Sequence, residues 1–241
     1  MDNFPLWADH TLALLFGLAI PLYSAYKRPK DLAGRHFESH QKNRIYLANS
    51  ISLFLMALVI LVVWLLYKRP LAELGFKQIS NIYAWWWLAL IFILLYLVDT
   101  GIAISSKENL QRTFNARNTK TPFMPTKQHE LPLYFLMCFS AGVFEEIIFR
   151  GFLVTYCLYL FSGFNDPELW AVILPAAVFS IAHFYQGKKA VFKIFILSIL
   201  FGFIFIHSAS LLIVMLLHFL VDATGGLLTL KYMKEENDED S

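Results

Sequence analysis

Long apolar runs, separated from one another by charged residues or by Pro and Gly, are the feature that most constrains this chain. A helix needs about 20 apolar residues to cross a bilayer. We predict membrane helices at about residues 11–26, 45–67, 83–105, 131–149, 152–161, 169–185, 190–207 and 210–230. Hydrophobic residues make up 58% of the chain and charged residues only 16%, whereas soluble domains are about half apolar and a quarter charged. The sequence therefore predicts an all-α, polytopic transmembrane helical bundle of about eight helices.

The fifth of these segments is too short to cross a bilayer alone. We expect it to begin inside the membrane after a helix break at Gly151, or to tilt against its neighbours. The chain is expected to divide into N-terminal transmembrane helices with basic loops (1–130), a core (131–230) and an acidic tail (231–241). Because this tail is rich in charge and poor in apolar residues, we expect it to be disordered.

Lysine and arginine residues concentrate in the connections after the first and third predicted helices, within residues 27–44 and 107–127. Cytoplasmic loops of membrane proteins carry an excess of these residues. We therefore place both connections in the cytoplasm and, with eight crossings, both termini outside. The short chain and its lack of organelle signals indicate a multi-pass protein of a bacterial plasma membrane. Its expected partners include the lipid bilayer, and no nucleic acid is expected.

Ionisable residues within the apolar runs concentrate in three places, and the first of these contains Glu145, Glu146 and Arg150. A charged side chain at mid-bilayer costs about 2.5–3.5 kcal/mol, so such residues usually face a protein interior or a wet cavity. Glu146 and Arg150 are four residues apart, which lets them pair on one helix face. Adjacent glutamates point about 100° apart on a helix, so Glu145 keeps no obvious local partner and is suited to proton transfer. The alternative is that both glutamates are interfacial and solvated.

Two histidines form the second and third polar places. His183 lies near the end of the sixth predicted helix, where a lone histidine can also be purely structural. His218 and Asp222 in the last helix share a face, so Asp222 can fix the tautomer and orientation of the imidazole, although hydrogen bonding between helices is an alternative role. Because the fourth, sixth and eighth helices would run in the same direction, the three places would fall at a similar depth. The pattern predicts an acid–base site in a water-reachable cavity.

Motifs of several other intramembrane hydrolases are absent from the sequence. A His-Glu-x-x-His zinc protease needs two histidines one helical turn apart, but His129-Glu130 is followed by Leu131-Pro132-Leu133. There is neither a Gly-x-Ser-x-Gly segment beside a histidine nor a Gly-x-Gly-Asp aspartate. The two cysteines, Cys138 and Cys157, lie in apolar runs and indicate neither a disulfide framework nor a metal pair.

The sequence resembles the CAAX protease and bacteriocin-processing family, also called the Abi family. Members carry Glu-Glu-x-x-x-Arg, Phe-x-x-x-His and His-x-x-x-Asn/Asp in that order. The corresponding residues, called the motif residues below, are Glu145, Glu146, Arg150, Phe179, His183, His218 and Asp222. A Gly151-Phe152 pair follows the arginine, as family members often have. The resemblance covers about residues 131–230, and the first three predicted helices match only in hydrophobicity.

The resemblance implies a glutamate-dependent intramembrane endopeptidase. Glu145 would be the general base that deprotonates a water, and His183 would help to hold and polarise that water. His218 with Asp222 would stabilise the developing oxyanion. An ionised aspartate cannot donate a hydrogen bond, so Asp222 would have to be protonated or act by orienting His218. Glu146, Arg150 and Phe179 would then position the catalytic groups.

The sequence leaves alternatives open for the cofactor, the substrate and the function. We favour a mechanism without a cofactor, but Glu145, His183 and His218 could instead supply the three protein ligands of a catalytic zinc. The expected substrate is a membrane-associated peptide or protein, possibly prenylated, because eukaryotic relatives cut the C-terminal tripeptide from prenylated CAAX proteins. The alternative function is a non-catalytic bacteriocin-immunity or scaffold protein of the same fold. A proton-coupled transporter is less favoured, since inverted repeats and paired broken helices are not evident.

Overall fold

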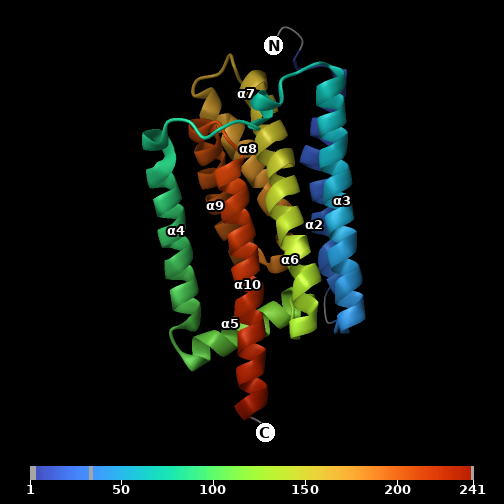
Figure 1. Cartoon of the computed structure of the whole chain (residues 1–241), viewed down its shortest axis with the longest axis vertical. Helices are drawn as coiled ribbons and strands as arrows, with labels where there is room; N and C mark the ends of the chain where they lie inside the picture. Colours follow the sequence, from blue (N-terminus) through green and yellow to red (C-terminus); the bar gives the residue numbers. More distant parts are fainter. Residues whose placement is uncertain (1–3, 33–34, 240–241) are drawn as a thin grey trace.

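The chain forms a bundle of helices, seen in a computed structural model that describes residues 4–32 and 35–239 (Figure 1). Within these ranges there is no β-strand. The first half comprises α1 (Trp7–Leu14), η1 (Leu15–Ala19), α2 (Ile20–Leu32), α3 (Ser39–Leu66), η2 (Leu71–Leu74), α4 (Ile82–Ile104) and α5 (Lys107–Lys120). The second half comprises η3 (Gln128–Glu130), α6 (Leu131–Ser140), η4 (Ala141–Glu145), η5 (Ile147–Val154), α7 (Thr155–Leu160), α8 (Pro167–Ala182), η6 (Phe184–Gln186), α9 (Lys188–Ser208) and α10 (Leu212–Glu239).

The prediction of a polytopic helical bundle is confirmed. In the part of the chain that the structure describes, six helices are long and apolar enough to cross a membrane. They are Trp7–Arg28, Ser39–Leu66, Ile82–Ile104, Gln128–Leu160, Lys188–Ser208 and Leu212–Met233, and α8 is a shorter apolar helix. Large apolar side chains cover their outer faces, for example Leu97 and Val98 of α4, which are 58% and 59% exposed. A soluble protein rarely exposes such surfaces, so they are lipid-facing.

The fourth and fifth predicted segments are one helix, which corrects the predicted break at Gly151. Residues Gln128–Leu160 form a single 33-residue span, called the long helix below. Gly151 lies inside it, and a Cβ atom added there would be 2.9 Å from the carbonyl oxygen of Leu74 in η2. The glycine therefore allows a close backbone approach by η2 rather than ending the helix.

Joining these segments removes one crossing and changes the predicted topology. In Figure 1 the long helix runs upward, whereas α8 and α10 both run downward. The prediction that the fourth, sixth and eighth helices share one direction is therefore wrong. The N-terminal end lies at the top of the bundle and the C-terminal end at the bottom, so the prediction that both termini lie on one side is also wrong. The basic connections before α3 and around α5 lie together at the lower end.

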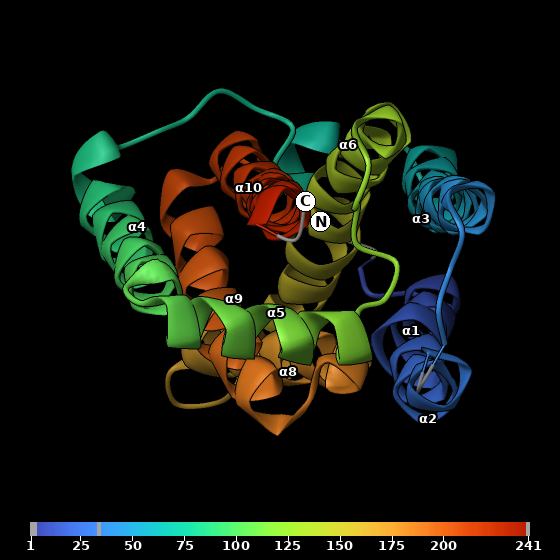
Figure 2. The ribbon, with the colours of Figure 1, turned by 90° about the horizontal axis from the view of Figure 1, so that it is seen from below.

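Two polar segments are helical where the sequence predicted none. Helix α5 lies across the lower end of the bundle, in front of α8 and α9 in Figure 2, which shows the bundle from below, where a connecting loop was expected. Helix α10 continues to Glu239, through most of the segment 231–241 that was expected to be disordered. Lysine and glutamate, which dominate this segment, are good helix formers, so they can extend a helix that a membrane span has already nucleated.

Candidate active site

The three polar places of the sequence come together between the long helix, α8, α9 and α10. Glu145 and Glu146 lie where the π-helical segments η4 and η5 meet. His183 is the C-cap residue of α8, and His218 lies near the start of α10. Single π-helical turns are common at functional sites because they change which side chains face a neighbour. The long helix runs opposite to α8 and α10, yet their polar residues meet at one depth. They do so because Glu145 lies near the middle of its helix, His183 at the end of α8 and His218 near the start of α10.

Gly142 allows α10 to approach the long helix closely enough to form this site. A Cβ atom added at Gly142 would lie 2.9 Å from the backbone nitrogen of Phe219 and 3.0 Å from the carbonyl oxygen of Met215. Any larger residue would therefore push the two backbones apart. Since His218 precedes Phe219 and Glu145 follows Gly142 by three residues, this approach places the imidazole against the glutamates.

A buried ion pair forms the interior part of the site. Glu146 is 0% exposed and Arg150 is 2% exposed. The Arg150 Nη1 group donates to Glu146 Oε1 at 2.8 Å, so the pair expected from the four-residue spacing is present. Arg150 Nη2 donates to Ser198 Oγ at 2.8 Å. Ser198, on α9, was not anticipated, because a single serine in an apolar run carries no signal of its own.

Aromatic rings enclose the arginine and separate it from the histidines. The Arg150 guanidinium carbon is 4.8 Å from the ring centroid of Phe179 and 5.2 Å from that of Phe201. The ring of Phe179 is also 4.7 Å from the ring of His183 and 6.0 Å from that of His218. Cations are attracted to the faces of aromatic rings, so Phe179 packs simultaneously against the buried cation and both imidazoles.

Glu146 holds His218 in the structure, where the sequence pattern pointed to Asp222. His218 Nδ1 lies 2.7 Å from Glu146 Oε1. A carboxylate paired with arginine can only accept, so the Nδ1–H group donates to it. His218 Nε2 faces the more open side, 3.8 Å from Glu145 Oε2 and 3.6 Å from Asp222 Oδ2. The orienting contact therefore comes from a residue 72 positions away rather than from the neighbouring helical turn.

His183 is oriented by the backbone of its own helix. Its Nδ1 atom lies 2.8 Å from the carbonyl oxygen of Phe179. A carbonyl oxygen only accepts, so Nδ1 donates and Nε2 remains as the nitrogen that can act on another group. The Phe-x-x-x-His spacing thus has a local structural basis in this chain.

The two adjacent glutamates differ in exposure, and therefore in the chemistry that each can perform. The side chains of Glu145 and His218 are 15% and 11% exposed, and that of Asp222 is 38% exposed. Glu146 is fully buried. Glu145 and Asp222 are therefore accessible from outside the protein, whereas Glu146 can act only through the groups that it binds.

The residues considered for zinc do not fit a metal site as they are placed. Among residues 4–32 and 35–239, no group of three or more His, Cys, Asp or Glu side chains is arranged to hold a metal ion. Catalytic zinc needs such a set, usually with three protein ligands about 2.0–2.2 Å from the metal. No step below is therefore assigned to a metal.

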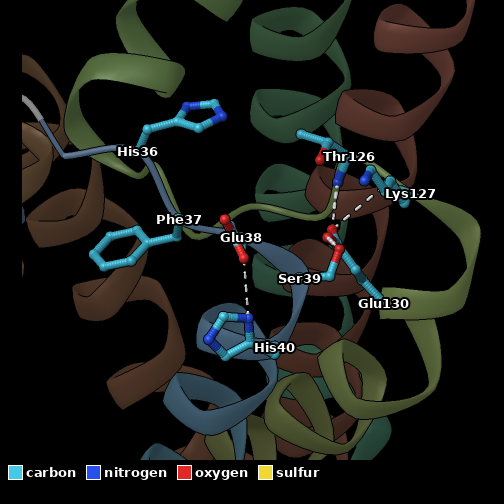
Figure 3. Close-up of a pocket in the computed structure, with 8 residues that line it drawn as sticks. All are labelled: His36, Phe37, Glu38, Ser39, His40, Thr126, Lys127 and Glu130. Carbon is cyan, nitrogen blue, oxygen red and sulfur yellow. Dashed lines mark hydrogen bonds and ion pairs between the residues drawn. The ribbon is translucent and has the colours of Figure 1, made fainter.

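A second polar cluster, at the lower end of the bundle, is separate from the motif residues (Figure 3). It lines a cavity of about 400 Å³ beside the start of α3. Its buried carboxylate, Glu130, accepts from Ser39 Oγ at 2.6 Å, from the Thr126 backbone nitrogen at 2.8 Å and from Lys42 Nζ at 3.2 Å. These bonds satisfy Glu130 and tie the start of α3 to the start of the long helix.

The fold and the site together define a polytopic helical membrane protein with a partly exposed glutamate–histidine cluster. Residues 127–224 match the family model described as type II CAAX prenyl endopeptidase Rce1-like. The matched segment contains all the motif residues, and the match confirms the resemblance drawn from the motifs. Comparison with curated proteins and with solved structures gave no match.

Proposed function

We propose that the chain is an intramembrane endopeptidase that hydrolyses a peptide bond of a membrane-associated protein or peptide, using a water activated by Glu145. The observation that carries the proposal is the contrast between the two adjacent glutamates. Glu146 is fully buried against Arg150 and His218, whereas Glu145 is partly exposed beside the outward nitrogen of His218. One glutamate is thus suited to positioning and the other to proton transfer.

In the proposed reaction, Glu145 takes a proton from a water that His183 Nε2 helps to hold, and the resulting hydroxide attacks the scissile carbonyl. His218, in its imidazolium form, keeps Nδ1–H on Glu146 and directs Nε2–H to the developing oxyanion. Glu145 then passes its proton to the leaving amine, which restores the carboxylate. Asp222, 3.6 Å from His218 Nε2, would hold that N–H group until the substrate carbonyl replaces it.

The remaining motif residues act on this chemistry indirectly. Arg150 balances the charge of Glu146, and both side chains are buried. An uncompensated buried carboxylate would be strongly disfavoured, so the arginine allows Glu146 to remain charged and to hold His218. Phe179 sets the spacing between the two imidazoles.

Glu145→Gln tests the assignment of the general base. The substitution keeps the shape of the side chain but removes its proton-accepting carboxylate, so we expect cleavage to fall by about 10²- to 10⁴-fold. Cleavage would be followed in purified protein reconstituted into vesicles, by mass spectrometry of candidate peptides with and without a prenyl group. Glu168→Gln, at an exposed glutamate in the first turn of α8, is the matched control and should cleave normally. Wild-type turnover by Glu145→Gln would reject the assigned role.

Metal removal distinguishes this mechanism from the zinc-dependent alternative. Because no step is assigned to a metal, we expect protein treated with a chelator and dialysed to retain cleavage within about twofold, well below the 10²-fold effect expected for a lost catalytic group. Complete loss of cleavage that zinc alone restores would favour the zinc mechanism. Bacteriocin protection that survives Glu145→Gln would instead support the non-catalytic immunity function.

For location, the six long apolar helices and the family match establish a multi-pass membrane protein. We propose a bacterial plasma membrane, with the basic lower end of the bundle facing the cytoplasm. That end carries the connections at residues 27–44 and 107–127, together with Lys188 and Lys189 at the start of α9. Excess Lys and Arg is the feature that keeps such segments in the cytoplasm during insertion.

A further inference from the structure

The buried carboxylate of the site is bound through only one of its two oxygens. Arg150 Nη1 and His218 Nδ1 both donate to Glu146 Oε1, at 2.8 and 2.7 Å. Within the described residues, Glu146 Oε2 is buried and has no hydrogen-bond partner. The carboxylate therefore does not hold the guanidinium with two parallel hydrogen bonds, which is the arrangement that fixes the orientation of both groups.

A buried arginine elsewhere in the chain shows the arrangement that Arg150 lacks. Arg69 Nη1 donates to Asp9 Oδ1 at 2.7 Å, and Arg69 Nη2 donates to Asp9 Oδ2 at 2.8 Å. Such a planar fork fixes the rotation of the guanidinium by itself. Because Arg150 makes a single contact with Glu146, a further group is needed to hold the rest of its guanidinium.

Ser198, in the middle of α9, provides this further contact. Arg150 Nη2 donates to Ser198 Oγ at 2.8 Å, and Ser198 is only 4% exposed. The rings of Phe179 and Phe201 also pack on the guanidinium. An aromatic face attracts a cation, but it does not select which N–H group points in which direction. The hydrogen bond to Ser198 therefore sets which edge of the guanidinium faces Glu146.

The hydrogen bonds continue from Ser198 to the proposed oxyanion donor. Arg150 connects Ser198 to Glu146, and Glu146 Oε1 accepts from His218 Nδ1. Since an imidazole ring is rigid, a shift of Oε1 that moves Nδ1 also moves Nε2, on the partly exposed side of the ring. The position of His218 Nε2 thus depends on a serine that lies two contacts away from the histidine.

We propose that Ser198 is a positioning residue for catalysis, which fixes Arg150 and thereby, through Glu146, the position of His218 Nε2. The kinetic consequence of this inference rests on the proposed endopeptidase function. Ser198 contacts none of the groups that react with substrate in that function. Its loss should therefore slow the chemical step and leave substrate binding unchanged.

Ser198→Ala tests this role because it removes the hydroxyl that accepts from Arg150. We expect kcat for peptide cleavage in vesicles to fall about 10- to 100-fold, with KM within about twofold of wild type, since a small misplacement of a catalytic group has an effect of this size. Ser198→Cys keeps the size of the side chain but offers only a weak acceptor, so kcat should fall similarly.

Ser208→Ala is the matched control for these variants. Ser208 is also a buried serine of α9, but its hydroxyl bonds to the carbonyl oxygens of Phe205 and Ser210, at 3.5 and 3.1 Å. Cleavage by this variant should be normal. Wild-type kcat in Ser198→Cys would assign the effect of Ser198→Ala to lost packing, and a change in KM alone would assign it to substrate binding. Either result would overturn the proposal.

The imidazole signal of His218 tests the positioning without any substrate. With ¹⁵N-labelled histidine in detergent micelles, NMR would detect the Nδ1–H group that donates to Glu146, assigned by its loss in His218→Gln. We expect Ser198→Ala and Ser198→Cys to shift or broaden this signal, and Ser208→Ala to leave it unchanged. A wild-type signal in Ser198→Ala would overturn the proposal. A protein that cleaves no peptide but whose signal changes in Ser198→Ala would reject the endopeptidase function and leave the positioning by Ser198 standing.

Discussion

Arg150→Met tests the buried ion pair on which the geometry of the site depends. The substitution leaves an aliphatic side chain of similar length but removes the hydrogen bonds to Glu146 and Ser198, both 2.8 Å long. Glu146, which is 0% exposed, would then carry a buried charge whose remaining partner is His218. Removing one partner of a buried pair typically costs about 3–5 kcal/mol. Against a total stability of about 5–15 kcal/mol, this loss is about a fifth of the free energy of unfolding at least, and about all of it at most.

The same reasoning predicts that a second substitution rescues part of this loss. In Glu146→Gln/Arg150→Met the unpaired charge is gone, and the amide oxygen can still accept from His218 Nδ1. We therefore expect the double variant to be about 1–3 kcal/mol more stable than the sum of the two single variants, which is the range of coupling between residues in contact. Denaturant unfolding in detergent micelles, followed by tryptophan fluorescence, would measure the four free energies.

An exposed pair with the same spacing provides the control. Arg112 and Glu108 of α5 are also four residues apart, with Nη2 and Oε1 2.8 Å apart, but their side chains are 73% and 81% exposed. Arg112→Met should therefore cost no more than about 0.5 kcal/mol. Additive effects of Glu146→Gln and Arg150→Met, or a loss in Arg150→Met as small as in Arg112→Met, would refute the reasoning.

Substitutions at Gly142 and at Asp222 test how α10 supports the site. Gly142→Ala should displace α10, because its Cβ would lie 2.9 Å from the Phe219 nitrogen. The misplaced catalytic groups should lower cleavage by about tenfold or more. Gly101→Ala, with no atom within 4 Å of the added Cβ, is the control, and equal cleavage by both variants would exclude a role for the close approach. Asp222→Asn should keep cleavage within about tenfold of wild type, since the amide oxygen can still accept from His218 Nε2–H, whereas Asp222→Leu, which leaves that oxyanion donor unsupported, should lose about 10²-fold. Peptide cleavage rates in vesicles would measure both, and equal rates for Asp222→Asn and Asp222→Leu would contradict the role given to Asp222.

Features that act within one helix could be predicted from the sequence. A bilayer leaves a spanning segment little choice but to be helical, because its backbone groups must bond to one another. The apolar runs therefore predicted the bundle correctly. The Glu146–Arg150 pair was predictable for the same reason, since a separation of four residues in a helix fixes which side chains meet.

Features that depend on contacts between helices were not predictable in this way. His218 has Asp222 one turn away, yet its Nδ1–H group is taken by Glu146 on another helix. Ser198 and Arg28 lie in segments without any motif, and only the folded arrangement brings them to Arg150 and Tyr185. Gly151 has two structural meanings, a helix break or a close approach, and the second requires η2, which lies far away in the sequence.

Helix α2 lies outside the family segment but contacts that segment close to His183. The family segment, residues 127–224, supplies every group that the proposed reaction uses. A hydrogen bond nevertheless joins α2 to the end of α8, because Ser24 Oγ donates to the carbonyl oxygen of Ala182 at 3.4 Å, next to His183. Arg28 of α2 also packs on Tyr185, two residues after His183, and donates to Asn49 of α3. Because α2 supplies none of the reacting groups of the proposed function, changes in it should act on cleavage only through the position of His183.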